Sequence, residues 1–360
     1  MKIIHISNLP AKLIQRKPAH SDFYIKSLLE DNDINFEIIN PSKFGTNKII
    51  ANIRLIIAVL KSNPDIIYNP RGLHILVMLR AIRFLKAQII TWKYTAPQET
   101  PPLINYILRK IYWRGFDRIY MISKSHMQDA IRNNILTSEQ VYNLNLGVDY
   151  QWFKSNINFT TQTHEFTIVA TGKDSRDYHT LCEACVCTKA QCIILTRKHP
   201  ENIIVEKKYR QYSNINFIFI EDLNLKKDEE YTYIMNQMSK ASVAAIPCHK
   251  KEYGVGYTQV IESLPYSIPI LLTDNKDIPL NVEKHQIGFL IAPYDVEKWI
   301  YHIKRLKDDK NLVKQLGINA QQLMKAEYNA QQTYKLIKED LYAIYKKKHS
   351  ITSVSYTHLR

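Results

Sequence analysis

One segment of the sequence combines an anion-binding pattern with a carboxylate: residues 256–273, G-Y-T-Q-V-I-E-S-L-P-Y-S-I-P-I-L-L-T. Gly254 and Gly256 form a small turn before a short helical pattern, where backbone N–H groups and the helix dipole favour an anion. Glu262 follows about two turns later, where it can accept hydrogen bonds from sugar or ribose hydroxyls. Diphosphate at one end and hydroxyls at the other indicate a nucleotide sugar, although a helix start with one solvated glutamate explains this segment equally well.

The elements that must position this segment alternate strand and helix patterns along the chain. A first series of apolar strand-like runs lies at residues 3–6, 36–39, 65–68, 88–92 and 118–122, separated by helical patterns near 21–30, 48–61, 73–86, 102–115 and 124–133. A second series lies at 166–170, 193–195, 215–220, 243–246 and 268–272, and helical patterns follow near 295–307, 309–324 and 330–347. This alternation predicts an α/β protein with two Rossmann-like, doubly wound domains.

The domain boundary is predicted near residue 150, because a polar stretch occupies the region between Gly147 and Thr163. We therefore expect an N-terminal domain at 1–150, onto which the C-terminal helix packs back, and a C-terminal domain at 151–349. Residues 350–360, which end in T-S-V-S-Y-T-H-L-R, match neither the preceding helix nor a packing pattern. We interpret them as a non-native tail.

Composition indicates a globular protein. The 360 residues suffice for two full cores, 45% of them are hydrophobic, and the mean hydropathy is −0.29. No apolar run approaches the roughly 18 to 20 residues that span a bilayer. The opening M-K-I-I-H-I-S fits a buried strand better than a signal peptide, so we expect a cytoplasmic protein.

Four of the five cysteines cluster at Cys182, Cys185, Cys187 and Cys192. The first two fall on a predicted helix and the last on the next strand, whereas a zinc site usually needs two ligand pairs at turn spacing. We therefore expect buried free thiols and no metal. The nine glycines include no G-x-G-x-x-G or Walker A pattern, which argues against a standard dinucleotide enzyme or P-loop NTPase.

The net charge of +15 is concentrated in the first half of the chain. Residues 1–155 hold 21 Lys and Arg against 11 Asp and Glu, a net of +10, which leaves +5 for the rest. This balance suits a membrane surface, a nucleic acid or a phosphorylated substrate. No nucleic-acid-binding motif accompanies the charge, so nucleic acid is not an expected partner.

Residues 101–118 form a helical pattern with both an apolar and a basic side. Leu103, Ile107 and Ile111 share one face, and the polar side carries Arg109, Lys110, Arg114 and Arg118. Such a helix suits an anionic bilayer, where it would reach a lipid-linked acceptor. A core-packed helix with a solvated basic edge explains the pattern equally well.

Residues 145–153 read N-L-G-V-D-Y-Q-W-F, and residues 171–184 read T-G-K-D-S-R-D-Y-H-T-L-C-E-A. With these motifs, the sequence from 141 to 325 resembles the GT-B glycosyltransferases, specifically the family-4-like glycosyl transferases group 1. The first motif looks like the family linker N-G-V-D-x-x-x-F. Residues 171–184 resemble G-R-x-x-x-x-K-x-x-x-x-L-x-x-A with a shortened loop, so that Lys173 follows Gly172 in the Arg position and Arg176 takes the Lys position. The resemblance implies that these cations hold the donor diphosphate, while a solvated basic turn is the alternative.

The family's E-x7-E signature is half present. Glu262 matches the second Glu, which the resemblance assigns to donor hydroxyls, while Gly254 occupies the first position. Glu252, ten residues before Glu262, is a candidate replacement. The resemblance also assigns donor contacts to Gly256, Tyr257 and Thr258. Residues 285–291, H-Q-I-G-F-L-I, fit the family's following strand.

In the first domain the resemblance is weaker. Pro18-Ala19-His20-Ser21 replaces the family's glycine pair after the first strand. His20 is an acceptor-side candidate, although a histidine near a helix start is more often a cap-region residue. Lys93 and Tyr94 follow the fourth strand, where sites of α/β proteins form, and are the other acceptor-side candidates.

Together with the motif residues quoted above, the resemblance implies a hexosyltransferase whose two Rossmann-like domains face each other across a cleft. The donor would be a nucleoside-diphosphate sugar, and transfer would occur with retention at the anomeric carbon, without metal or other cofactor. Lys173 and Arg176 would neutralise the diphosphate, and Glu262 would orient the donor. The expected setting is bacterial surface-polysaccharide synthesis with a glycan or lipid-linked acceptor, in the cytoplasm or peripherally at the inner face of the plasma membrane.

Two other interpretations stay open. Sugar-nucleotide 2-epimerases share the fold, but they need acid and base side chains around the cleft that the sequence does not clearly offer. A GT-B subunit that binds a partner without catalysis would account for the missing first Glu and the missing glycine pair.

Overall fold

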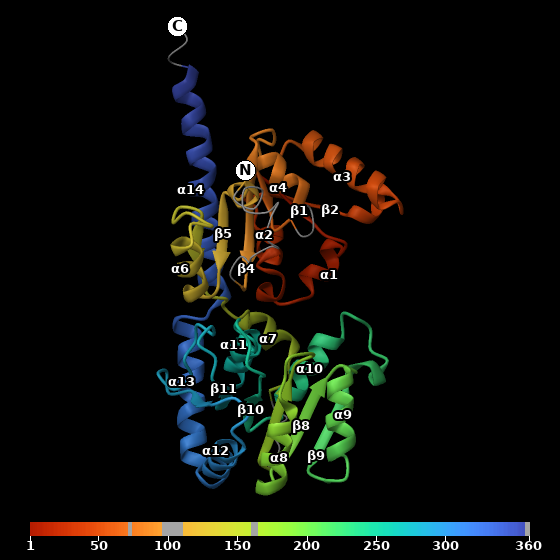
Figure 1. The fold of residues 1–360 in the computed structure, drawn as a ribbon, viewed down its shortest axis with the longest axis vertical. Helices are drawn as coiled ribbons and strands as arrows, with labels where there is room; N and C mark the ends of the chain where they lie inside the picture. The colour runs from red at the N-terminus through yellow and green to blue at the C-terminus, as the bar shows by residue number, and fades with distance from the viewer. Residues whose placement is uncertain (71–73, 96–110, 160–164, 357–360) are drawn as a thin grey trace. The chain divides into compact units, whose positions relative to one another are not determined.

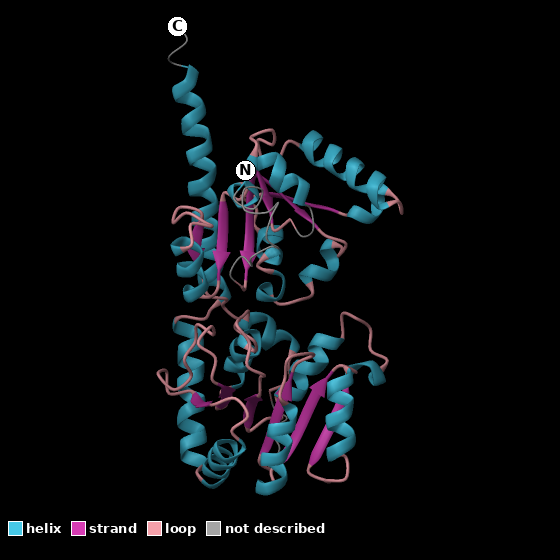
Figure 2. Ribbon diagram, in the orientation of Figure 1, coloured by secondary structure: helices cyan, strands magenta, loops and turns pink. Residues whose placement is uncertain are grey.

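The computed structural model describes residues 1–70, 74–95, 111–159 and 165–356, without the side chains of residue 48 and of 348–356. The chain forms two compact units (Figure 1). Unit 1 comprises Met1–Asn145 with Ala330–Arg360, and unit 2 comprises Leu146–Asn329. Each contains a six-stranded parallel sheet flanked by helices, as the alternating pattern predicts (Figure 2).

The sheet of unit 1 has the strand order β2-β1-β3-β4-β5-β6, and every neighbouring pair is parallel. Its strands are β1 (Lys2–Ile6), β2 (Asn35–Ile39), β3 (Ile66–Tyr68), β4 (Gln88–Lys93), β5 (Arg118–Met121) and β6 (Val141–Asn143). The first five lie where the apolar runs predict them. The sixth was missed, because its three residues V-Y-N contain no apolar run.

The helices of unit 1 cover both faces of this sheet. They are α1 (Ala11–Gln15), η1 (Ala19–Asp22), α2 (Ile25–Glu30), η2 (Pro41–Phe44), α3 (Lys48–Ser62), α4 (His74–Ala81), α6 (Lys124–Arg132) and α14 (Ala330–Tyr356). On one face, Leu55 and Val59 of α3 and Val77 of α4 join a buried cluster with Ile4 and Ile67 of the strands. This burial of apolar side chains stabilises the unit.

The C-terminal helix packs back on unit 1, as the sequence analysis expects, although the range 151–349 counted it with the second domain. Asp340 of α14 accepts hydrogen bonds from Arg118 Nη2 at 2.9 Å and from Tyr120 Oη at 2.9 Å. Ile337 and Leu341 on the same helix are fully buried. Because these contacts are made to strand β5 of the first sheet, the structure assigns residues from 330 onward to the N-terminal unit.

The sheet of unit 2 has the order β12-β11-β10-β7-β8-β9, again with parallel pairs throughout. Its strands are β7 (Thr167–Thr171), β8 (Gln191–Thr196), β9 (Ile215–Phe219), β10 (Val243–Ile246), β11 (Ile270–Thr273) and β12 (Gly288–Ile291). Its helices are α7 (Tyr150–Asn156), α8 (Tyr178–Thr188), α9 (Pro200–Tyr209), η3 (Ile220–Leu223), α10 (Glu230–Met238), α11 (Tyr257–Ser263), η4 (Leu264–Tyr266), α12 (Val296–Asp308) and α13 (Lys310–Ala326). Residues expected to form a linker before 163 therefore include a helix, α7.

The clustered cysteines lie where helix α8 packs on the sheet. Cys182, Cys185 and Cys192 are buried, whereas Cys187 is exposed, and all four are free thiols. A hydrogen bond with Cys192 and burial raise the pKa of the Cys185 thiol, so it stays protonated at neutral pH. Within the described ranges, no group of three or more His, Cys, Asp or Glu side chains has the geometry of a metal site. In those same ranges no helix is both long and apolar enough to span a bilayer.

Candidate active site

The turn after β7 is built around a glycine. Gly172 has a φ of 141°, and a Cβ there would lie 2.5 Å from Arg176 Nε, so only glycine fits. Its carbonyl accepts hydrogen bonds from Tyr178 Oη at 2.8 Å and from Thr196 Oγ1 at 2.7 Å. The turn is thus fixed from two sides, and the Arg176 guanidinium lies directly over it.

Arg176 connects this turn to helix α11. Its Nε donates to the Thr171 carbonyl at 3.2 Å, while Nη1 and Nη2 make longer contacts, to the Asp174 carbonyl at 3.4 Å and to Gln259 Oε1 at 3.5 Å. Hydrogen bonds of that length are weak. The guanidinium is therefore held in place by Nε while its outer nitrogens can still bind an anion.

The exposed Lys173 stands on a backbone that Asn202 holds in place. Asn202 Nδ2 donates to the Lys173 carbonyl at 3.2 Å, to Thr196 Oγ1 at 2.8 Å and to the Arg197 carbonyl at 3.1 Å. Asn202 is 3% exposed, and its contacts join the turns after β7 and β8. The sequence analysis did not identify this residue, because its partners lie up to 29 positions away.

Glycines also shape the turn after β10. Gly256, with a φ of 91°, begins helix α11, and a Cβ there would lie 2.7 Å from Ile246 Cγ2 and 3.1 Å from Cys248 Sγ. A Cβ at Gly254 would lie 2.9 Å from the Asp277 carbonyl oxygen. Both glycines therefore allow backbone to pack closely against neighbouring strand ends, a structural role that the donor-binding interpretation did not include.

Glu262 is 9% exposed and accepts a hydrogen bond of 2.6 Å from Tyr231 Oη on α10. Burial, together with the neighbouring Glu262, holds the pKa of Tyr231 well above its usual range, so the phenol remains a donor. The Tyr231 ring packs edge-on against Trp152, with centroids 5.3 Å apart. Tyr231, which the sequence analysis missed, therefore fixes one oxygen of this carboxylate.

The remaining donor-side candidates differ in exposure. Tyr257 is buried and Thr258 is half-buried at the start of α11. Glu252 is exposed on the loop after β10, which Asn275 Nδ2 holds by donating to the Tyr253 carbonyl at 2.8 Å. Among the contacts of the described residues, none joins Glu252 to Glu262.

Other charged groups at this edge are already paired. Arg197 forms an ion pair with Glu230, which is the largest cause of the raised pKa of its guanidinium. Lys198 forms an ion pair with Asp222. In contrast, no carboxylate of the described residues lies within ion-pair distance of the two predicted phosphate-binding cations. Two cations with unused charge beside a strand end are suited to hold an anion.

The carboxyl edge of the unit 1 sheet is aromatic instead. His20 is 2% exposed in η1, and Phe23 beside it packs on Trp92 at 5.4 Å and on Tyr94 at 5.6 Å between ring centroids. The structure therefore brings the loop after β1 and the end of β4 together. His126 of α6 also reaches this region, with Nδ1 3.4 Å from the Tyr94 carbonyl.

Lys93 is the cation of this edge. Its ammonium lies 5.6 Å from the centroid of the Trp113 ring, and burial lowers its pKa. Residues 101–110 of the predicted membrane helix lie outside the described residues. Arg118, placed on the basic side of that helix, instead begins β5 and binds Asp340, which corrects its expected role.

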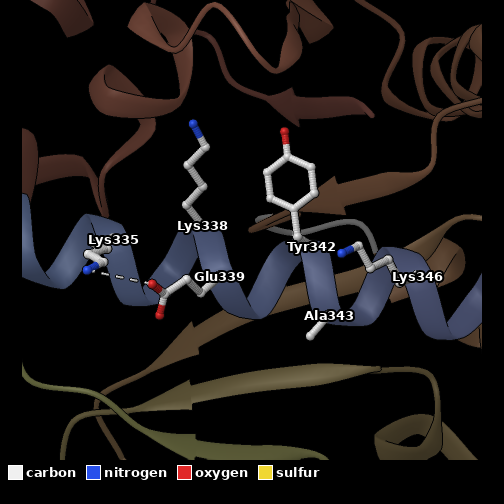
Figure 3. Close-up of a pocket in the computed structure, with 6 residues that line it drawn as sticks. All are labelled: Lys335, Lys338, Glu339, Tyr342, Ala343 and Lys346. Carbon is white, nitrogen blue, oxygen red and sulfur yellow. Dashed lines mark ion pairs between the residues drawn. The ribbon is translucent and has the colours of Figure 1, made fainter.

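A hollow of about 490 Å³ along the outer side of α14 contains none of the predicted site residues. Figure 3 shows its lining: Lys335, Lys338, Glu339, Tyr342, Ala343 and Lys346. Lys338 is paired with Asp31 at 2.9 Å and with Asp33 at 2.7 Å. Its charge is therefore used to attach α14 to unit 1.

Comparison with known proteins identifies the fold and a family match over part of the chain. Residues 207–323 match the family described as Glycosyl transferases group 1. A glycosyltransferase from Rickettsia africae has 14% identity and a TM-score of 0.68 over 96% of this chain and 98% of that chain. Anabaena Alr3699/HepE, solved in complex with UDP, has 14% identity and a TM-score of 0.66 over 95% and 100%. No curated protein is a significant match in sequence.

A proposed UDP-N-acetylglucosamine 2-epimerase from Listeria monocytogenes also shares the fold, at 11% identity and a TM-score of 0.60 over 96% of this chain and 97% of that chain. The two units thus define a protein of the GT-B class. Residues 207–323, from the end of α9 into α13, match the family of glycosyl transferases group 1. This match includes Glu262 but begins after the turn that carries Lys173 and Arg176.

Proposed function

We propose that the protein transfers a sugar from a nucleoside-diphosphate donor, held by unit 2, to a glycan or lipid-linked acceptor in bacterial surface-glycan synthesis. The observation that carries this proposal is the pair of cations after β7, Lys173 and Arg176, neither of which has a carboxylate partner among the described residues. Arg176 also contacts Gln259, three residues from Glu262 on the same helix, so the charged turn and the carboxylate lie on connected elements.

The cations would act on the leaving group. When the bond between the anomeric carbon and the diphosphate breaks, negative charge grows on the phosphate oxygens, and fixed positive charges stabilise it. The Arg176 fork suits two phosphate oxygens, whereas Lys173 supplies a mobile point charge. We propose that these two cations replace a metal ion in this neutralisation. Transfer with retention at the anomeric carbon is what the resemblance to the family implies.

The carboxylate would orient the donor. Tyr231 donates to one oxygen of Glu262. An ionised carboxylate accepts several hydrogen bonds, so in the proposed complex Glu262 would accept from donor hydroxyls. Thr258 Oγ1 and backbone N–H groups near Gly256 would add contacts at the start of α11, with Tyr257 as their packing support. We propose the acceptor side in unit 1, around His20, Lys93 and Tyr94, with His126 as an additional candidate.

The first test is a thermal-shift series with UDP, GDP, ADP and dTDP. A ligand that binds only the folded protein raises its melting temperature as its concentration increases. We expect a shift with one nucleotide, lost in Lys173→Ala and Arg176→Ala but retained in Arg210→Ala, whose exposed guanidinium pairs with Glu206. No shift with any nucleotide, tested with and without lipid vesicles, would favour the non-catalytic subunit.

The epimerase alternative rests on the fold shared with the Listeria protein. Incubation with the donor followed by analysis of both sugar and nucleotide separates the two reactions. A glycosyltransferase releases nucleoside diphosphate and lengthens the acceptor, whereas an epimerase returns a nucleotide sugar with inverted C2. In the same assay, full activity of Glu252→Ala would exclude Glu252 as the replacement for the missing first Glu.

A further inference from the structure

Helix α3 of unit 1 has two apolar faces, of which only one is used by the core. Leu55 and Val59 are buried against the sheet. The opposite side carries exposed isoleucines and a leucine, with exposed fractions of 73% at Ile49, 47% at Ile50, 52% at Ile53, 45% at Ile57 and 38% at Leu60. Their spacing of three and four residues places them in one stripe along the helix.

The stripe continues beyond the end of α3. Leu60 and Phe84 line the same cavity of about 160 Å³, so the turn between α4 and β4 lies beside the end of the helix. Phe84 is 67% exposed and Ile82 is 63% exposed. We call Ile49, Ile50, Ile53, Ile57, Leu60, Ile82 and Phe84 together the α3 face. Single exposed apolar residues are common, but a continuous series of them marks an interaction surface.

The segment of the chain that contains the α3 face is strongly basic. Between residues 38 and 98 the chain carries nine Lys and Arg and one acid, Asp65. That acid is occupied, because its Oδ2 accepts a hydrogen bond of 2.8 Å from the Lys2 backbone N–H. Five exposed cations lie on α3, just before it in η2, or in the turn after α4: Lys43, Arg54, Lys61, Arg83 and Lys86. A partner must therefore offer apolar contact and negative charge over a distance of about 22 Å, the length of a 15-residue helix.

We propose that the α3 face is a docking surface for an anionic lipid bilayer. Helix α3 lies at the periphery of unit 1 (Figure 1). In the proposed complex it lies in the membrane plane with its isoleucines and Phe84 at the boundary of headgroups and acyl chains, while the nearby cations bind lipid phosphates. A second copy of the chain fits this surface poorly, since a symmetric contact would oppose two rims of the same charge. The α3 face contains none of residues 101–118, and lipid binding is measurable without any glycosyl transfer.

The test is co-sedimentation of the full chain with vesicles of phosphatidylcholine, with and without phosphatidylglycerol. We expect binding only when phosphatidylglycerol is present, weakened by salt because headgroup attraction is screened. The double variant Ile53→Glu, Ile57→Glu should lower the partition coefficient by about tenfold or more, since two apolar contacts are replaced by two anions. Both side chains are exposed, so the melting temperature should stay unchanged.

A matched control is Ile204→Glu, which changes an isoleucine that is 68% exposed on α9 of unit 2. It should bind vesicles like the unchanged protein. The pair Arg54→Glu, Lys61→Glu tests the charge of the face separately, and it should remove the preference for phosphatidylglycerol. The proposal would be overturned if the Ile53→Glu, Ile57→Glu variant bound vesicles as strongly as the unchanged chain. Absence of vesicle binding, or a concentration-dependent dimer that the variant abolishes, would also overturn it.

Discussion

The carboxyl edges of the two sheets have the same architecture but opposite chemistry. In unit 2 this edge carries a glycine turn with two cations, Lys173 and Arg176, whose charge no described carboxylate neutralises. In unit 1 the same edge is filled by Phe23, Trp92 and Tyr94. Because both edges follow six parallel strands, the difference comes from the connecting loops and not from the sheets.

The two edges also differ in which residues adopt positive φ in their turns. Unit 2 places Gly172 and Gly256 at positive φ, where glycine adopts the conformation without strain. Unit 1 places Phe23 and Tyr24 in the left-handed region, at φ of 53° and 63°. Bulky residues adopt this conformation only when their surroundings stabilise it, and Tyr24 is fully buried. The edge of unit 2 thus presents cations on glycine-shaped turns, whereas the edge of unit 1 is ordered by aromatic packing.

Loss of the Arg176 guanidinium should have the largest effect. Arg176→Ala removes a fixed charge that would stabilise the leaving diphosphate, so kcat/KM should fall by about 10² to 10³-fold. Steady-state kinetics with the donor found by thermal shift measures the effect, and Arg210→Ala is the matched surface control. If Lys93→Ala in unit 1 reduced nucleotide binding as strongly, the contrast between the two edges would be wrong.

A methyl group at Gly172 should have the next largest effect. Gly172→Ala combines a positive φ with a Cβ 2.5 Å from Arg176 Nε, so the guanidinium must move. We expect destabilisation of about 1 to 3 kcal/mol and weaker nucleotide binding. Gly45→Ala is the control, because it has a φ of 114° but its Cβ would meet only Arg54 Nη1 at 3.9 Å. Unchanged nucleotide affinity in Gly172→Ala would contradict the role of this turn.

Variants of two buried tyrosines distinguish an effect on stability from an effect on ligand binding. Tyr231→Phe removes the donor to Glu262, and Tyr266→Phe removes a donor to the Met235 carbonyl at 2.7 Å. Each should lower the free energy of unfolding by about 1 kcal/mol. Only Tyr231→Phe should also weaken nucleotide binding, by a few fold, as titration calorimetry would show. Equal nucleotide affinity in both variants would limit Tyr231 to a structural role.

The smallest effect concerns Lys93 and pH. Its folded pKa lies below the ordinary 10.5, so in the window just below 10.5 the unfolded chain binds more protons than the folded one. The contribution of Lys93 to stability should therefore rise with pH through that window. Lys93→Met should remove this rise of the free energy of unfolding with pH. The measurement is denaturant unfolding of both proteins at neutral and at alkaline pH. An unchanged rise with pH would show that burial does not affect the charge of Lys93.

The sequence predicted those parts of the fold and site that local patterns determine. The apolar strand runs, the glycine turns and the positions of Arg176 and Glu262 are all visible within short windows. Tyr231, Asn202 and His126 are not, because each acts through partners about 30 positions away. The C-terminal helix was expected to pack back on the N-terminal domain, but its partners there were not predicted, since its ion pair with Arg118 spans 222 positions.

Because α14 belongs to unit 1, truncation of the chain would affect the two units differently. Unit 2, Leu146–Asn329, is a continuous insertion between two parts of unit 1, and its ends meet where the Val148 N–H donates to the Tyr328 carbonyl at 2.8 Å. A gene fragment for the insertion alone can therefore encode a complete sheet with its helices. A stop codon placed after Asn329 would instead damage the N-terminal unit, because it would remove Ile337 and Leu341 from a core whose strands were translated more than 200 residues earlier.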